Sequence, residues 1–172
     1  MSYSPTNLLL SLAYALAQAV QSGGGQATLG QDLFVHQLPA SASNTSGGAA
    51  VMRIFGGPAE NDLRPVPTVS VQCMTYAPGE DAGAGLQFAQ RLYDALHDSG
   101  NADRPRQTWS VAAKKLDANG NLVDDDNFPG GWDIRLVVLT SGPPAILGRG
   151  DASTGGRWEI SFNFNVRLTA PE

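Results

Sequence analysis

The sequence predicts an α+β fold in which a mostly antiparallel β-sheet is packed by two α-helices. Two segments have helical periodicity, strand-like runs lie before, between and after them, and the chain closes with two long alternating segments. Helices segregated from mainly sequential strands are typical of this class rather than of alternating parallel units. Since 172 residues suit one domain with its own core, we expect a single domain over 1–172.

The first helix is expected at 5–21. Pro5 suits its first turn, and the glycines at 23–25 supply a stop. One stripe at helical spacing is apolar and should face the core. The stripe consists of Leu9, Leu12, Ala13, Leu16 and Val20. Leu8 and Leu10 lie off it, so we expect them to offer a second face to a neighbouring subunit.

The second helix is expected within 80–98, where the apolar period changes from that of a strand to that of a helix. Gly83 and Gly85 weaken its first turns, which predicts an ordered helix that begins nearer Leu86. Gly100 provides its end.

Strands are predicted where apolar and polar residues alternate. The predicted strands are 32–38, 50–55, 68–76, 132–139 and 157–169. In 132–139 the alternation places Trp132, Ile134, Leu136 and Val138 on one apolar face. The last strand alternates throughout 157–169, far beyond the mean strand of about five or six residues. Flexible loops are expected near 39–48 and 118–131, and 117–120 should be a turn.

Composition excludes several classes of function. With 11 Lys+Arg against 16 Asp+Glu, the net charge of -5 would repel a phosphate backbone and argues against a nucleic-acid binder. The single Cys73 excludes an internal disulfide and predicts a buried thiol. The apolar run 8–20 is too short to cross a bilayer and has no basic residue before it, so we expect a soluble protein with no membrane partner.

No motif predicts catalysis, a cofactor or a metal. His36 and His97 have no ligand partners at zinc spacing, and the carboxylates of 124–126 are expected to form a solvated acidic loop. A calcium loop that starts at Asp117 would need glycine at position six and glutamate at position twelve, where the chain has Leu122 and Phe128. A nucleophile elbow and a dinucleotide fingerprint are also missing, so we expect a protein that is not an enzyme.

Four segments together resemble a known family. The strand 68–76 is followed by the helix 86–97, the turn 144–149 and the strand 156–166. Their order and spacing resemble the tail terminators of tailed bacteriophages, which are often called minor capsid proteins. The resemblance covers roughly 68–169.

This resemblance implies a structural virion protein. Members form a ring, usually of six subunits, that caps the tail tube, ends tail elongation and joins the tail to the head. The expected partners are other copies of the chain, the tail tube protein and the head–tail connector or stopper, with DNA only passing through the lumen. The expected location is the head-proximal end of the virion tail, after assembly in the host cytoplasm.

Polar residues near the end of the chain are the candidates for contacts between subunits or within the turn. They are Arg149, Asp151, Arg157, Glu159, Asn163 and Arg167. In the family pattern the aspartate follows the arginine directly, whereas here Gly150 separates the two. A ring needs two different patches on each subunit, and the long last strand is a natural place for backbone or side-chain pairing.

Two other functions stay open. A head-side stopper or adaptor would bind components near the portal and leave tail tubes of uncontrolled length. A soluble ligand-binding or hydrolytic domain would instead show a pocket lined by convergent polar groups.

Overall fold

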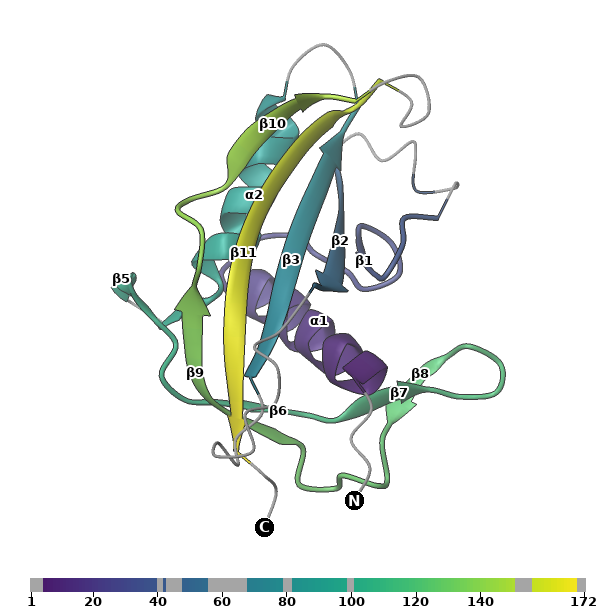
Figure 1. Ribbon diagram of the computed structural model, residues 1–172. Coiled ribbons are helices and arrows are strands. Elements are labelled where there is room, and N and C mark those ends of the chain that lie inside the picture. Colours follow the sequence, from purple (N-terminus) through teal and green to yellow (C-terminus); the bar gives the residue numbers. More distant parts are fainter. Residues whose placement is uncertain are drawn as a thin grey trace.

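The computed structural model describes residues 5–39, 42, 48–55, 68–78, 82–98, 101–150 and 156–169. Within them, two helices cover one face of a mostly antiparallel sheet, which confirms the predicted α+β class (Figure 1). The helices are α1 (Pro5–Ser22) and α2 (Gly83–Asp94). The strands of the main sheet are β1 (Leu33–Val35), β2 (Ala49–Ile54), β3 (Thr68–Ala77), β6 (Trp109–Val111), β9 (Trp132–Leu139), β10 (Ala145–Arg149) and β11 (Trp158–Thr169). Two small antiparallel pairs are β4 (His97–Asp98) with β5 (Asn101–Pro105), and β7 (Lys114–Leu116) with β8 (Leu122–Asp124).

Six of the seven described strands of the main sheet run in the order β1-β2-β3-β11-β9-β6. The seventh, β10, pairs with the first part of β11, and β9 pairs with the last part. Only β1 and β2 pair in parallel. The strands at the two ends of this order, β1 and β6, are short, whereas the centre of the sheet is made of the two longest strands, β3 and β11.

Helix α1 confirms the predicted span almost to the residue. Its expected apolar stripe is buried. Leu8 and Leu10 are buried as well, at 0% and 7% exposure, so the expectation that they face a neighbouring subunit is wrong. The reason is that α1 packs against β1 and β2 and is also contacted by β7 of the same chain. Neither described helix is both long and apolar enough to cross a membrane.

Helix α2 begins earlier and ends earlier than expected. It starts at Gly83, and a Cβ on Gly85 would lie only 2.4 Å from the Cβ of Ala77. Gly85 therefore lets the helix approach β3 closely. The helix stops at Asp94, and Arg106 then satisfies the carbonyls of the next two residues: its Nε donates to Ala95 O at 2.8 Å and its N–H to Leu96 O at 2.9 Å.

The core lies between the helices and the inner face of β3 and β11. The predicted apolar side of β11 is confirmed, with Ile160, Phe162, Phe164 and Val166 at 0% or 1% exposure. Phe162 packs edge-on against Tyr93 of α2, with ring centroids 5.5 Å apart. Each such side chain contributes about 1.5–3 kcal/mol by leaving water.

A β-bulge in β9 changes the predicted faces of that strand. Leu136 pairs with Arg167 and Ile134 with Leu168, so one extra residue lies on β9 between these pairs. The extra residue inverts the alternation beyond it. Val137 is consequently buried at 1% exposure and Val138 is exposed at 41%, so the prediction that Val138 faces the core is wrong.

The segment 145–149 was expected to be a turn and is instead strand β10. The expected loop near 118–131 contains β8, while the turn at 117–120 is confirmed by the bond from Gly120 N to Asp117 O. Most of the loop expected near 39–48 lies outside the described residues.

Candidate functional site

The β10–β11 hairpin carries the polar residues that the sequence singled out. Arg149 lies at the end of β10 opposite Trp158, and its Nε donates to Gly156 O at 2.6 Å. Gly150 N donates to Arg157 O at 2.8 Å in the same turn. Arg149 therefore holds the two ends of the hairpin turn together. Asp151 lies outside the described residues.

Glu159, Asn163 and Arg167 follow one another along the outer face, the face of the main sheet opposite the helices. Glu159 lies opposite Tyr76, and Asn163 lies opposite Gln72. From Arg157 to Arg167 a strand spans roughly 34 Å at about 3.4 Å per residue. The structure therefore places these residues along one surface and does not bring them into a cluster.

Asn163 marks the point where the neighbour of β11 changes from β10 to β9. Its N–H donates to Ser141 Oγ at 2.7 Å, and its carbonyl accepts from Thr140 N at 3.0 Å. The Asn163 Oδ1 atom is buried and has no hydrogen-bond donor among the described residues. The backbone of Asn163 thus fixes the connection from β9 to β10.

The long strand β11 cannot pair with another subunit through its backbone. It pairs with β3 along one edge and with β9 and β10 along the other. The expectation of backbone pairing there is wrong, because length and alternation in a sequence do not reveal a strand's place in the sheet. Among the described strands, the unpaired edges belong to β10 and to the end strands β1 and β6.

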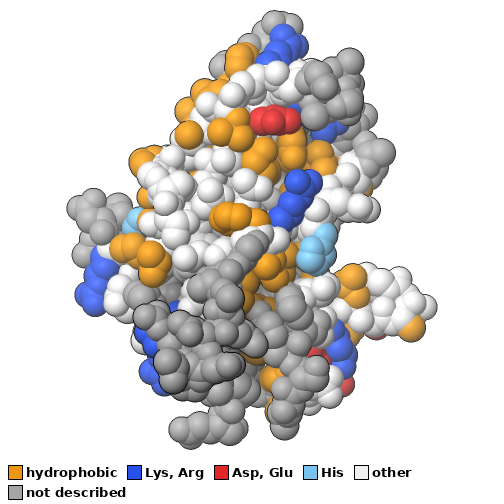
Figure 2. All heavy atoms as spheres, viewed as in Figure 1, with side chains coloured by type: hydrophobic (Ala, Val, Ile, Leu, Met, Phe, Trp, Pro, Cys, Tyr) orange, Lys and Arg blue, Asp and Glu red, His pale blue; other side chains and the backbone are white. Residues whose placement is uncertain are grey.

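The β10 edge combines an open backbone with exposed apolar side chains. Ile146 is 47% exposed and Leu147 is 59% exposed. Leu147 lies where the pairing register with β11 is interrupted. Figure 2 shows apolar side chains along the upper left edge of the molecule, where Figure 1 places β10. An open edge with apolar side chains is a template for pairing with another chain.

Uncharged polar residues lie along the middle of β3 and β11 on the outer face. Charged side chains are few and scattered on the part of the molecule that Figure 2 colours. The central residues are Ser70, Gln72, Ser161, Asn163 and Asn165. Val138 adds an exposed apolar side chain opposite Asn165. Ser70 is buried, whereas Gln72, Ser161 and Asn165 are partly exposed and offer hydrogen-bonding groups.

A second hairpin, called the arm (Lys114–Asp124, strands β7 and β8), projects from the body beside the start of α1 (Figure 1). Its base rests on α1. The Lys114 N–H donates to the hydroxyl of Ser11 at 2.8 Å, and the Lys114 ammonium lies 4.5 Å from the ring centroid of Tyr14. The buried Ser11 hydroxyl in turn donates to Asn7 O at 2.6 Å.

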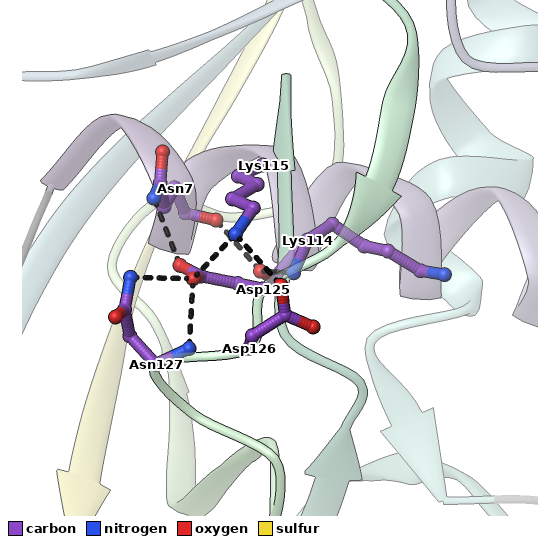
Figure 3. A network of polar contacts seen from close by, with 7 residues as sticks. Asn7, Lys114, Lys115, Asp125, Asp126 and Asn127 are labelled. Atoms are coloured by element: carbon purple, nitrogen blue, oxygen red, sulfur yellow. Dashed lines mark hydrogen bonds and ion pairs between the residues drawn. The ribbon is translucent and has the colours of Figure 1, made fainter. Parts of the chain in front are cut away.

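Asp125 is the centre of the polar network at the base of the arm (Figure 3). Its carboxylate is 1% exposed and accepts from Asn7 Nδ2 at 2.9 Å and from Asn127 Nδ2 at 3.0 Å. Lys115 Nζ lies 3.7 Å from Asp125 and 3.3 Å from Asp126. Burial raises the pKa of Asp125, but hydrogen bonds from Asn127 and Asn7 and the charge of Lys115 outweigh it and leave that pKa below its ordinary value.

The tip of the arm is organised by Asp117. Its carboxylate accepts from the N–H groups of Asn119 and Asn121, each at 2.8 Å, and from Asn121 Nδ2 at 3.1 Å. The backbone bond from Asn121, followed by that from its side chain, lowers the pKa of Asp117. Leu116, beside this turn, is 51% exposed. The arm is thus fixed at both ends and presents an apolar side chain to solvent.

A groove of about 1380 Å³ lies where α1 and α2 end, beside β6. Its walls combine apolar residues with the exposed Arg91 and Asp94 of α2. Apolar lining residues include Ala15, Ala19, Val20, Trp109 and Val111. The guanidinium carbon of Arg106 lies 4.8 Å from the centroid of the Trp109 ring. The Nε atom of the same side chain donates to Ala95 O, just beyond α2.

The remaining reactive groups have structural roles. Cys73 is fully buried, and burial raises the pKa of its thiol to about 12. His97 Nδ1 lies 3.0 Å from Tyr93 O, and His36 O accepts from Arg53 Nε at 2.8 Å. Among the described residues, no three His, Cys, Asp or Glu side chains are placed to hold a metal ion.

Sequence reasoning missed both the open edge and the arm. The signal for the edge was present in the apolar pair Ile146 and Leu147 beside Gly148, whose φ is 145°. The arm gives a weaker signal, because its strands are three residues long and carry as many charges as apolar residues.

Compared with known proteins, the chain matches no protein-family model, and it matches no curated protein sequence at a significant level.

Proposed function

We propose that this chain is a structural virion protein of a tailed bacteriophage that assembles into a ring, caps the tail tube at its head-proximal end and meets the head connector. The ring, of six subunits by resemblance to tail terminators, ends tail elongation and leaves a lumen through which DNA passes. The proposal assigns the chain no enzymatic activity.

The observation that carries this proposal is the open, apolar edge of β10. The segments of the family resemblance lie on β3, α2, β10 and β11; the elements β3, α2 and β11 contact one another, and β10 contacts β11. The edge strand therefore belongs to the same unit as the quoted motifs. Association through this edge would shield Ile146 and Leu147 from water and complete the backbone hydrogen bonds of β10.

Sedimentation of the wild-type chain over rising concentrations, alone and with tail tube protein, tests the proposal. We expect a discrete ring and, in electron micrographs, tubes whose growth stops when the chain is added. A strict monomer that leaves tube growth unchanged would refute ring formation and capping. Rings that bind connector components while tube length stays uncontrolled would favour the head-side stopper instead.

Ile146→Lys tests the role of the edge. The substituted side chain stays exposed in the monomer, so folding is retained, whereas self-association should weaken about tenfold or more. Phe55→Lys is the matched control, because Phe55 is similarly exposed, at 42%, and follows β2, which β3 and β11 separate from β10. Equal loss of association in both variants would argue against the β10 edge.

A further inference from the structure

We propose that the arm of one copy docks in the groove beside α1 and α2 of the next copy, as a second contact within the ring. This inference rests on the proposed function and names the two surfaces that would meet. The occupant of the groove is thus a second copy of the chain.

The arm has the properties of a docking element. It is fixed at its base through Asp125 and Ser11 and at its tip through Asp117, so docking would cost little conformational entropy. Its own chain leaves Leu116 half exposed. A pre-organised hairpin with an exposed apolar side chain is suited to insertion into a partner.

The groove can receive this element. A five-residue tip, 117–121, has a volume on the order of 600 Å³ at close-packed density, which the groove of about 1380 Å³ accommodates. The apolar walls that include Ala19 and Trp109 provide contacts for Leu116. Both surfaces can therefore bury apolar area when they meet.

Charge favours the same pairing. Outside the buried Asp125, the arm and its base carry Asp117, Asp124 and Asp126 against Lys114 and Lys115, which leaves a negative balance. Among the described residues that line the groove, Arg91 and Arg106 stand against Asp94, which leaves a positive balance.

The ends of the two helices do not cancel this attraction. Gly23 N and Gly25 N donate to carbonyls in the last turn of α1, and Arg106 donates to Ala95 O beyond α2. The carbonyls that would repel an acidic tip are thus partly satisfied.

The proposed contact joins two different patches of the chain. The arm rests on the first half of α1, at Asn7 and Ser11, whereas the groove is lined by the end of that helix. Such a contact closes into a ring when it repeats from subunit to subunit, whereas a reciprocal exchange of arms stops at a dimer.

Disulfide trapping between copies tests the contact. Ala118→Cys places a thiol at the exposed tip, and Gln26→Cys places one at the exposed rim of the groove. The native Cys73 is buried, so it gives a clean background. We expect dimers when the two variants are mixed under oxidising conditions, little product from either alone, and a ladder up to the ring size from the double variant.

Three results would overturn the inference. Tip-to-tip dimers of Ala118→Cys alone would indicate a symmetric contact. Wild-type rings without trapping in the mixture would refute the arm contact and leave the proposed function standing. A wild-type chain that sediments only as a monomer would refute both.

Leu116→Ser gives an independent measure that does not depend on thiol geometry. We expect ring association about tenfold weaker than in the wild type, with unchanged folding of the monomer. Ile146→Lys combined with Leu116→Ser should weaken association more than either change alone, since the two surfaces are distinct. Association of Leu116→Ser at wild-type strength would contradict the proposal.

Discussion

The two hairpins differ in what holds them. The β10–β11 hairpin is anchored by the apolar side of β11, which includes the fully buried Phe162. The arm has no comparable core and is anchored by Ser11, Asn7 and Asp125. Hydrophobic burial fixes the first hairpin, whereas a small set of hydrogen bonds and ion pairs fixes the second. Substitutions should therefore separate the two by size of effect and by dependence on pH.

The largest difference is expected between Phe162→Ala and Leu116→Ala. The first removes a buried ring that packs against Tyr93 and should lower the free energy of unfolding by about 3–5 kcal/mol. The second truncates a half-exposed side chain and should change it by no more than about 0.5 kcal/mol. Urea unfolding followed by circular dichroism measures both. Similar losses would mean that the arm shares the main core.

Gly131→Ala tests the segment that connects the arm to strand β9 of the sheet. Gly131 has φ 75°, and a Cβ there would lie 2.4 Å from Val111 O. Strain and overpacking together should cost about 2–4 kcal/mol. Gly130→Ala is the control, since nothing lies within 4 Å of the Cβ it would add. Thermal unfolding that is the same for both variants would refute this account.

Asp125→Asn should destabilise the chain by about 1–3 kcal/mol, because an amide cannot accept all the donors that now face the carboxylate. Asp126→Asn is the adjacent control: its side chain is 91% exposed, so the loss of its contact with Lys115 should cost about 0–1 kcal/mol. Urea unfolding at pH 7 measures the difference. Equal effects would show that the network in Figure 3 does not depend on the buried carboxylate.

Asp125→Asn should also have an effect that depends on pH, unlike Phe162→Ala. Since the pKa of Asp125 is lowered in the folded chain, its contribution is complete above the unfolded value of about 3.9. That contribution is lost as the pH falls through the lower folded pKa. The destabilisation caused by Asp125→Asn should therefore shrink in strong acid, whereas that caused by Phe162→Ala should not. Unfolding curves from neutral to acid pH test this.

The smallest effect is expected for Arg149→Gln. Arg149 is exposed, and its Nε donates to Gly156 O across the hairpin turn, so loss of this solvent-exposed contact should cost about 0–1 kcal/mol. Arg167→Gln, on the same sheet and equally exposed, removes no contact to that turn and is the control. A loss of several kcal/mol for Arg149→Gln alone would indicate that the turn governs the stability of the whole hairpin.

The comparison also explains how far sequence reasoning reached. The helical stripe of α1, the strand 132–139 and the buried face of β11 follow from periodicity, because apolar burial leaves a repeating pattern. The exposure of Val138 was not predicted, because a single bulge inverts the alternation without changing the composition of the strand. The contact of Arg106 with the carbonyls that follow α2 was not predicted, because Arg106 is distant from them along the chain.

The candidate site was predicted less completely than the fold. The polar residues of β11 were predicted correctly on one face of the strand. The position of β11 between two other strands was not predicted, because strand order depends on which segments pair after folding. The arm left no periodic signal, since Asp125 and Asn7 meet only after folding. Polar contacts between distant segments carry no local pattern that a sequence could display.

The change of neighbour at Asn163 has a consequence for local opening of the sheet. Residues 158–161 of β11 share one edge with β10, and residues 164–169 share it with β9. The two halves of one strand can thus exchange their amide hydrogens through separate openings. The β10 segment could detach and re-form while β9 and the core stay closed. An edge that meets a partner could in this way adjust its register without unfolding the subunit.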